Sequence, residues 1–274
     1  PPDSAHRTAD PRQNGRVTPP ARSARTTPSP FAGLSPEILA AVAQKLNGPL
    51  HAMTGLTGLL ASTSLSPEAR GWVEELRHQV GGLAGIVDDL IDMSSLGIGT
   101  LRLAPRAVVV RTMLDEIVAV ANDSIVDGTR VTCVVSDDVP AVVLADPDRL
   151  RQVVRHLVDN AVRHTHGGTV VIAATVLRTG RLSITVTDDG EGIPSSETER
   201  VFEPFLTASN SGQHTGSGLG LSLVRQVVAL MGGAVLLKSE LGKGTEVSVE
   251  IPLVAAPEPA AVATIEPSVA DGVR

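Results

Sequence analysis

Two short glycine clusters constrain what this chain can fold into more than any other feature. The first, Asp188-Asp189-Gly190-Glu191-Gly192, follows an alternating apolar run, so it predicts a tight turn at the end of a β-strand. The second, Gly216-Ser217-Gly218-Leu219-Gly220, precedes an apolar run with helical spacing. It therefore predicts the N-terminus of a helix, where backbone N–H groups have no partner within the helix.

The two clusters predict opposite ends of a nucleotide site. Gly190 and Gly192 allow positive φ and the close approach of a flat ligand, and the Asp188 carboxylate accepts a hydrogen bond from an amine such as that of adenine. The helix start at Gly220 attracts phosphate. Neither cluster has the form of a Walker loop or of a dinucleotide-binding fingerprint, and one glycine-rich turn alone is more often structural.

Further motifs before and after the clusters complete an ordered set. Residues 148–165 have helical apolar spacing and carry Asn160, while Val201-Phe202-Glu203-Pro204-Phe205 lies between the glycine clusters and Gly242-Lys243-Gly244-Thr245 follows them. This order resembles the N, first-glycine, F and second-glycine boxes of histidine-kinase ATP-binding domains. The same group includes gyrase-type ATPases.

The resemblance implies a two-layer α/β sandwich of the GHKL ATPase type that binds ATP and Mg²⁺. By resemblance, Asn160 coordinates Mg²⁺ through its side-chain oxygen. Arg163 is either a phosphate ligand or a solvated side chain. His156 occupies a position where the family often has a second Asn, and it either supports the ion or the attacking group or is a structural histidine. The nucleotide contacts then fall on Asp188, Gly190, Gly192, Gly216, Gly218, Leu219, Gly220 and Thr245, with residues 206–215 as a lid.

Residues 35–96 predict a helical hairpin. Ser35-Pro36-Glu37 and Ser66-Pro67-Glu68 each combine a capping serine, a proline at the first helical position and an acid in the first turn. Apolar residues then recur in steps of three and four: Leu39, Val42, Leu46, Pro49, Met53, Leu56 and Leu60, then Val73, Leu76, Val80, Leu83, Val87 and Leu90. Because one hairpin is too thin to be stable alone, we expect a homodimer with a four-helix bundle. The alternative is a hairpin packed on its own chain.

The first predicted helix departs from the family where phosphate is accepted. In sensor histidine kinases the acceptor histidine lies five residues before a Pro-Leu pair and is followed by an acid. Here the residues in those positions before Pro49-Leu50 are Gln44 and Lys45. An amide is not a nucleophile, and lysine cannot orient an imidazole. His51 lies one heptad further along the same helix face, roughly 10 Å away, and is the alternative acceptor.

Three functions fit these motifs. The first is a histidine kinase of a two-component phosphorelay that transfers the γ-phosphoryl group to His51 or to a partner's histidine, and then to a response regulator. The second is a pseudokinase scaffold that docks a response regulator or a partner kinase. The third, a gyrase-type ATPase, is disfavoured because His156 stands where that group has its water-activating acid. We expect no autophosphorylation at the usual site.

Composition argues against several other classes of protein. A net charge of −7 and an aromatic content of 1% disfavour a nucleic-acid surface. The single cysteine, Cys133, excludes an internal disulfide and lies in an apolar run typical of a buried structural thiol. No run is long enough to predict a membrane span. We expect a cytoplasmic location, with any sensor or membrane region upstream of Pro1.

These observations predict an α+β protein with five segments. They are a disordered basic arm (1–33), the hairpin (34–96), a linker (97–105), the ATP-binding domain (106–253) and a disordered tail (254–274).

Overall fold

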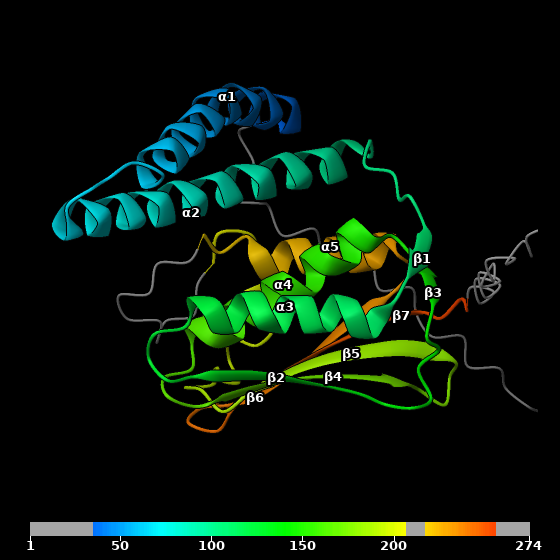
Figure 1. The fold of residues 1–274 in the computed structure, drawn as a ribbon. Helices are drawn as coiled ribbons and strands as arrows, with labels where there is room; N and C mark the ends of the chain where they lie inside the picture. Colours follow the sequence, from blue (N-terminus) through cyan, green and yellow to red (C-terminus); the bar gives the residue numbers. More distant parts are fainter. Residues whose placement is uncertain (1–34, 207–216, 256–274) are drawn as a thin grey trace, which may run out of the picture.

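The computed structural model describes residues 35–206 and 217–255 (Figure 1). The expected basic arm, nearly all of the expected lid, Gly216 and the tail from residue 256 lie outside the described residues.

Two long antiparallel helices form the N-terminal part. α1 (Pro36–Ala61) and α2 (Pro67–Ile98) start as expected, since the Ser35 hydroxyl accepts from the Ile38 N–H and the Ser66 hydroxyl accepts from the Ala69 N–H. α2 continues through Ile98 because the left-handed cap is supplied only at Gly99, which has φ 75°. The linker therefore begins at residue 99 rather than at 97.

Burial within the hairpin follows a seven-residue spacing. Ala43, Leu50 and Thr57 of α1 and Val73, Val80 and Val87 of α2 are buried. Most of the predicted apolar stripe nevertheless stays exposed on this single chain, including Val42, Leu46, Met53, Leu56, Leu60, Leu76 and Leu83. Seven glycines inside the two helices have open space where a Cβ would lie: Gly48, Gly55, Gly58, Gly71, Gly81, Gly82 and Gly85. One chain thus buries only one side of each helix.

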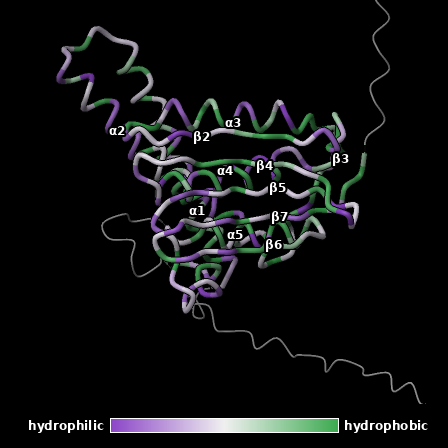
Figure 2. The backbone as a smooth tube through the Cα atoms, turned by 90° about the horizontal axis from the view of Figure 1, so that it is seen from below, coloured by the Kyte–Doolittle hydropathy of each residue, from purple (hydrophilic) through white to green (hydrophobic). Residues whose placement is uncertain are grey.

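The C-terminal part is a two-layer α/β sandwich, which confirms the expected fold class. Its mixed sheet has the strand order β2-β4-β5-β7-β6, visible from below in Figure 2. Three helices cover one face of this sheet (Figure 1). The strands are β2 (Arg130–Val135), β4 (Thr169–Val176), β5 (Arg181–Asp188), β6 (Ala234–Glu240) and β7 (Gly244–Pro252), and the helices are α3 (Val110–Ser124), α4 (Pro147–Arg163) and α5 (Gly220–Leu230).

A second, smaller sheet forms where the chain passes from the linker into the sandwich. β1 (Arg106–Val108) pairs with β3 (Val143–Ala145) in antiparallel fashion. Val143 also bridges to Ala255, so the first residues of the expected tail pack on this sheet.

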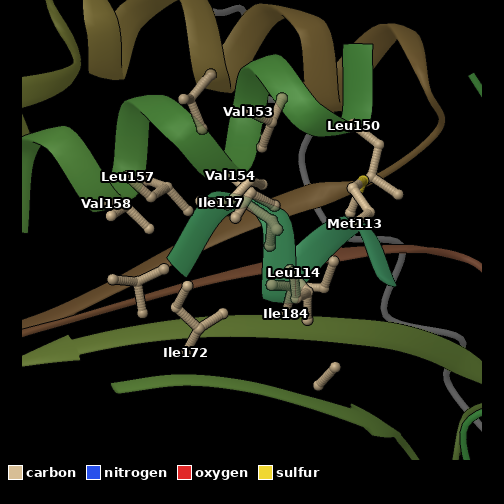
Figure 3. Packing of buried hydrophobic residues seen from close by; sticks show 14 of the residues in the cluster. Met113, Leu114, Ile117, Leu150, Val153, Val154, Leu157, Val158, Ile172 and Ile184 are labelled. Carbon is tan, nitrogen blue, oxygen red and sulfur yellow. The ribbon is translucent and has the colours of Figure 1, made fainter. Parts of the chain in front are cut away.

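Aliphatic side chains fill the space between α4 and the sheet (Figure 3). All six apolar positions that define the helical pattern of α4 are buried: Leu150, Val153, Val154, Leu157, Val158 and Ala161. They pack over Ile172 and Ile184 of the sheet, and each buried aliphatic side chain contributes roughly 1.5–3 kcal/mol. This packing turns the polar side of α4, with His156 and Asn160, away from the core.

The start of α4 is fixed by Asp146. Its Oδ1 accepts hydrogen bonds from the backbone N–H groups of Asp148 and Arg149, and its Oδ2 accepts one from the N–H of Ala104. We expect Asp146→Ala to lower the free energy of unfolding by about 2 kcal/mol, because a helix cap and the hydrogen bond from the Ala104 N–H are both lost. Urea denaturation measures this change.

Asp148→Ala is the matched control. Its side chain is 78% exposed and pairs only with the exposed Arg106, so we expect a loss below about 1 kcal/mol. Equal losses for the two variants would contradict the role given to Asp146.

Candidate nucleotide site

Asp188, the last residue of β5, collects hydrogen bonds from two of the predicted motifs. Its Oδ1 accepts from the N–H of Gly190 at 3.0 Å and from the N–H of Thr245 at 3.1 Å. Oδ2 takes part in neither bond. Burial raises the pKa of the Asp188 carboxyl, and the two backbone bonds oppose that rise. One carboxylate oxygen therefore organises the turn, while the other is available to a ligand.

Glycines allow three backbone segments to meet around this carboxylate. Gly192 has φ 69°, and a Cβ there would lie 2.1 Å from the carbonyl oxygen of Glu240. Gly190 does not have positive φ, so that expectation was wrong. It is required for a different reason, since a Cβ at this position would lie 2.1 Å from the carbonyl oxygen of His164. The end of α4 thus packs directly on the first glycine cluster.

An ion pair that sequence reasoning missed holds the same turn. Nδ1 of His164 lies 2.7 Å from Oε1 of Glu191, and the N–H of Glu191 donates to the carbonyl of His164. On its other side, the carbonyl of Glu191 accepts from the N–H of Gly242. His164 therefore fixes the turn. Within residues 35–206 and 217–255, no three His, Cys, Asp or Glu side chains form a metal-binding group.

The second glycine cluster leads into an uncapped helix. α5 begins at Gly220, and its N-cap residue Leu219 offers no side-chain acceptor to the first turn. Gly218 has φ 65°, and its carbonyl accepts from the N–H of Phe205 at 2.9 Å. The F and second-glycine boxes are therefore joined through this bond, and among the described residues no side chain caps the backbone N–H groups at the start of α5.

His156 is the side chain of α4 that meets the start of α5. A Cβ on Gly220 would lie 3.4 Å from its Nδ1, so the imidazole ring packs on that glycine. Eight residues later, His164 contacts Gly190, and eight residues of α-helix span about 12 Å. Asn160 is partly buried between these two contacts, while Arg163 is exposed. α4 therefore runs from one glycine cluster to the other with Asn160 between them.

Asp159 lies beside Asn160 and keeps contact with solvent. Packing around its carboxyl nevertheless raises the pKa of Asp159, and the nearby Arg155, His156 and Arg163 oppose this rise. The carboxylate of Asp159 is therefore only partly hydrated and lies near three basic side chains of the same helix.

The comparisons with known proteins agree with this geometry. Residues 37–99 match the His Kinase A (phospho-acceptor) domain, and residues 145–255 match the histidine kinase-, DNA gyrase B- and HSP90-like ATPase family. The chain belongs to the histidine kinase family. This confirms the resemblance drawn from the ordered boxes.

Individual relatives share both parts of this histidine-kinase core. The signal transduction histidine-protein kinase BarA of Escherichia coli K12 is 33% identical over 221 residues, which cover 78% of this chain and 24% of BarA. The sensor histidine kinase RcsC of the same strain is 32% identical, covering 81% of this chain and 24% of RcsC. The kinase core thus spans about a quarter of the length of these relatives.

A solved structure of full-length ShkA in complex with AMPPNP matches with a TM-score of 0.66 and 32% identity, covering 81% of this chain and 47% of that one. Among the described residues of the kinase core, none of the helices combines the length and apolarity needed to cross a bilayer.

The acceptor region of the kinase core lies on the outer helix of the hairpin. Gln44, Lys45 and His51 are all exposed on α1, and Figure 1 shows α2 between α1 and the helices of the sandwich. Nδ1 of His51 lies 2.9 Å from the carbonyl of Asn47. Because a carbonyl only accepts, that nitrogen carries a proton and Nε2 is the basic nitrogen. The structure does not bring Gln44 or His51 to the nucleotide site.

The inner helix α2 contacts the sandwich through polar groups that no sequence pattern indicated. Asp92 Oδ2 accepts from Arg149 Nη1 and from Gln152 Nε2, both at 2.6 Å. Asp89 Oδ1 lies 3.0 Å from His156 Nε2. Acidic residues on an amphipathic helix normally predict a solvated face, so the sequence did not predict this contact between α2 and the sandwich.

Cys133 is only partly buried, whereas the sequence predicted a buried thiol. Burial, aided by the carboxylate of Asp115 at 3.1 Å from Sγ, raises the pKa of this thiol to about 11. Cys133 is therefore protonated at neutral pH and is a poor nucleophile.

The raised pKa of Asp188 predicts how its replacement changes stability with pH. Because the folded-state pKa exceeds the unfolded value near 4, the ionised group destabilises the fold at neutral pH. That loss disappears as the pH falls through the folded pKa. We therefore expect Asp188→Asn to raise the Tm of the nucleotide-free protein at pH 7, with the difference vanishing near pH 4. Thermal unfolding of both proteins from pH 4 to 8 measures this. A lower Tm for Asp188→Asn at pH 7 would contradict the argument.

Proposed function

We propose that this histidine-kinase core binds ATP together with Mg²⁺ through residues 146–253. The observation that carries the proposal is the course of α4, which joins the two glycine clusters and places Asn160 between them. An extended nucleotide would lie along this helix, with adenine at Asp188 and phosphates at the start of α5.

Each end of the site suits one part of the ligand. At the adenine end, Oδ2 of Asp188 accepts from the exocyclic amine, while the glycine turn lets the flat base approach the backbone. At the phosphate end, the open N–H groups of the first turn of α5 donate to phosphate oxygens, and the helix dipole favours their charge.

Asn160 fits as the residue that would hold Mg²⁺. Its amide oxygen is a hard ligand suited to this ion, which usually retains several waters and also binds phosphate. When bound, the ion would neutralise part of the negative charge of the phosphates. The position of Asn160 supports this role, because it lies between the two ends of the proposed site on the side of α4 that faces away from the core.

The test of nucleotide binding is Asp188→Asn. Replacing Oδ2 by an amide removes an acceptor from the adenine amine, and a buried acceptor lost in this way costs roughly 1–3 kcal/mol. We therefore expect ATP affinity to fall by about tenfold to a hundredfold, measured by calorimetry with Mg²⁺ present. Asp189→Asn is the matched control, because Asp189 is exposed and, within the described residues, its side chain accepts a hydrogen bond only from the N–H of Thr169. Unchanged affinity for Asp188→Asn would refute this placement of adenine.

We further propose that residues 35–96 form the interface of a homodimer. The exposed apolar residues Val42, Leu46, Met53, Leu56 and Leu60 lie in steps of three, four and seven on α1, so they form one stripe. A second copy of the hairpin presents the same stripe, and pairing the two would produce a four-helix bundle.

Leu46→Glu tests the dimer. Leu46 is 46% exposed on the single chain, so its replacement leaves the hairpin contacts intact but places a charge in the proposed seam. We expect monomers by sedimentation at concentrations where the parent is dimeric. Lys45→Glu, one residue earlier and outside the stripe, should remain dimeric. A monomeric parent, or a dimer that tolerates Leu46→Glu, would refute the interface.

For phosphoryl transfer, we propose that the chain does not phosphorylate itself at the usual position. Gln44 offers no nucleophile there. His51 has a basic Nε2 and is exposed, but it lies roughly 10 Å from the usual position, and positioning errors near 1 Å already cost about a hundredfold in rate. The core then either phosphorylates a partner's histidine within a two-component phosphorelay or serves as a pseudokinase scaffold for a response regulator or a partner kinase.

Labelled ATP separates these outcomes in four proteins. We expect no acid-labile label on the parent and none on His51→Gln. We expect label on the double variant Gln44→His with Lys45→Glu, which restores both the nucleophile and the acid beside it. Gln44→His alone should recover little, because Lys45 places a cation beside the imidazole. Label on the parent that disappears in His51→Gln would make His51 the acceptor. A double variant that binds ATP but stays unlabelled would favour the scaffold.

A further inference from the structure

Asp89 is a buried acid on α2 that contacts a histidine of α4. It is 7% exposed and its Oδ1 lies 3.0 Å from Nε2 of His156 in α4. A carboxylate is removed from water only at a considerable free-energy cost, so a buried one is normally paired. Here the partner belongs to the nucleotide-binding domain rather than to the hairpin.

His156 is held between Asp89 and the phosphate end of the nucleotide site. Its Nε2 is buried and is not aligned for a hydrogen bond with any described residue, but it lies 3.0 Å from Oδ1 of Asp89. Its Nδ1 side packs on Gly220, the first residue of α5. The ring thus connects a carboxylate of α2 with the turn whose N–H groups would receive phosphate.

We propose that Asp89 is a positioning residue of the nucleotide site, which acts by holding the His156 ring against Gly220. This inference rests on the proposed function, since it assigns a task to the same site. Without the carboxylate, the buried Nε2 of His156 loses its contact with Asp89, and the ring gains by turning toward water. The first turn of α5 then loses its packing contact with the His156 ring.

Asp92 makes it possible to separate this role from simple docking of the two domains. It lies one turn along α2 and binds Arg149 and Gln152 of α4. The side chains of Asp89 and Asp92 are 10% and 16% exposed, so they are similarly buried. Only Asp89 is paired with His156. Asp92→Ala therefore weakens the same joint and leaves the ring on Gly220.

The first measurement is the affinity for ATP with Mg²⁺. We expect Asp89→Ala to weaken binding about fivefold to tenfold, the result of losing one buried interaction of roughly 1 kcal/mol or slightly more. We expect Asp92→Ala to stay within about twofold of the parent. In a His156→Ala background, Asp89→Ala should have no further effect, because residues that act through one contact are not additive.

The second measurement needs no nucleotide. In ¹⁵N-labelled protein, the Gly220 amide and the His156 ring nitrogens should shift in Asp89→Ala and keep their parent positions in Asp92→Ala. Asp89→Asn, which retains the volume and removes the charge, replaces Asp89→Ala if the latter does not fold, and should give shifts in the same direction.

The outcomes are distinct. Equal losses of affinity for Asp89→Ala and Asp92→Ala, or an undiminished effect of Asp89→Ala in the His156→Ala background, would overturn the positioning role. So would an unchanged Gly220 amide. A parent that fails to bind ATP, but whose Gly220 amide still shifts in Asp89→Ala, would refute the proposed function and leave the contact from Asp89 to α5 standing.

Discussion

The apolar side of α4 packed on the sheet is the contact on which the rest of the structure depends. Leu150, Val154 and Leu157 fix the helix both in rotation and along its axis, because each fills a separate place above Ile172 and Ile184 (Figure 3). Once that side is buried, the polar residues of α4 must lie on the opposite side, away from the sheet. His156 meets α5 and α2, and the end of the helix at His164 meets the first glycine cluster. The site is a consequence of core packing.

Local patterns predicted the elements well but not the contacts between them. The spacing of apolar residues in α4, and the Ser-Pro-Glu starts of both hairpin helices, report on a single helix, so they can be read without knowing its neighbours. The position of Gly190 shows the limit of such a reading, because the neighbour that excludes a Cβ is His164, which approaches only through the fold. The pairs His164–Glu191 and Asp89–His156 were unpredictable for the same reason.

The predicted acceptor position and the predicted nucleotide contacts differ in how much the fold depends on them. Gln44 is exposed on α1, so a change of side chain there does not alter the core. Asp188, Gly192 and Thr245 also hold backbone segments together. The predicted acceptor position can therefore vary without disturbing the fold, whereas the predicted nucleotide contacts cannot.

The glycines of the hairpin bear on how much of this protein is folded at all. Each of the seven with open surroundings destabilises its helix by about 0.5–1 kcal/mol relative to alanine, or by about 4–7 kcal/mol together. That sum approaches the whole stability of an ordinary small domain. In the proposed dimer, a hairpin with so thin a margin gains its order largely from the second copy, so folding and pairing are one equilibrium that depends on concentration. The sandwich needs no such partner for its core, which is formed within one chain, so concentration would act on the two parts of the proposed dimer differently.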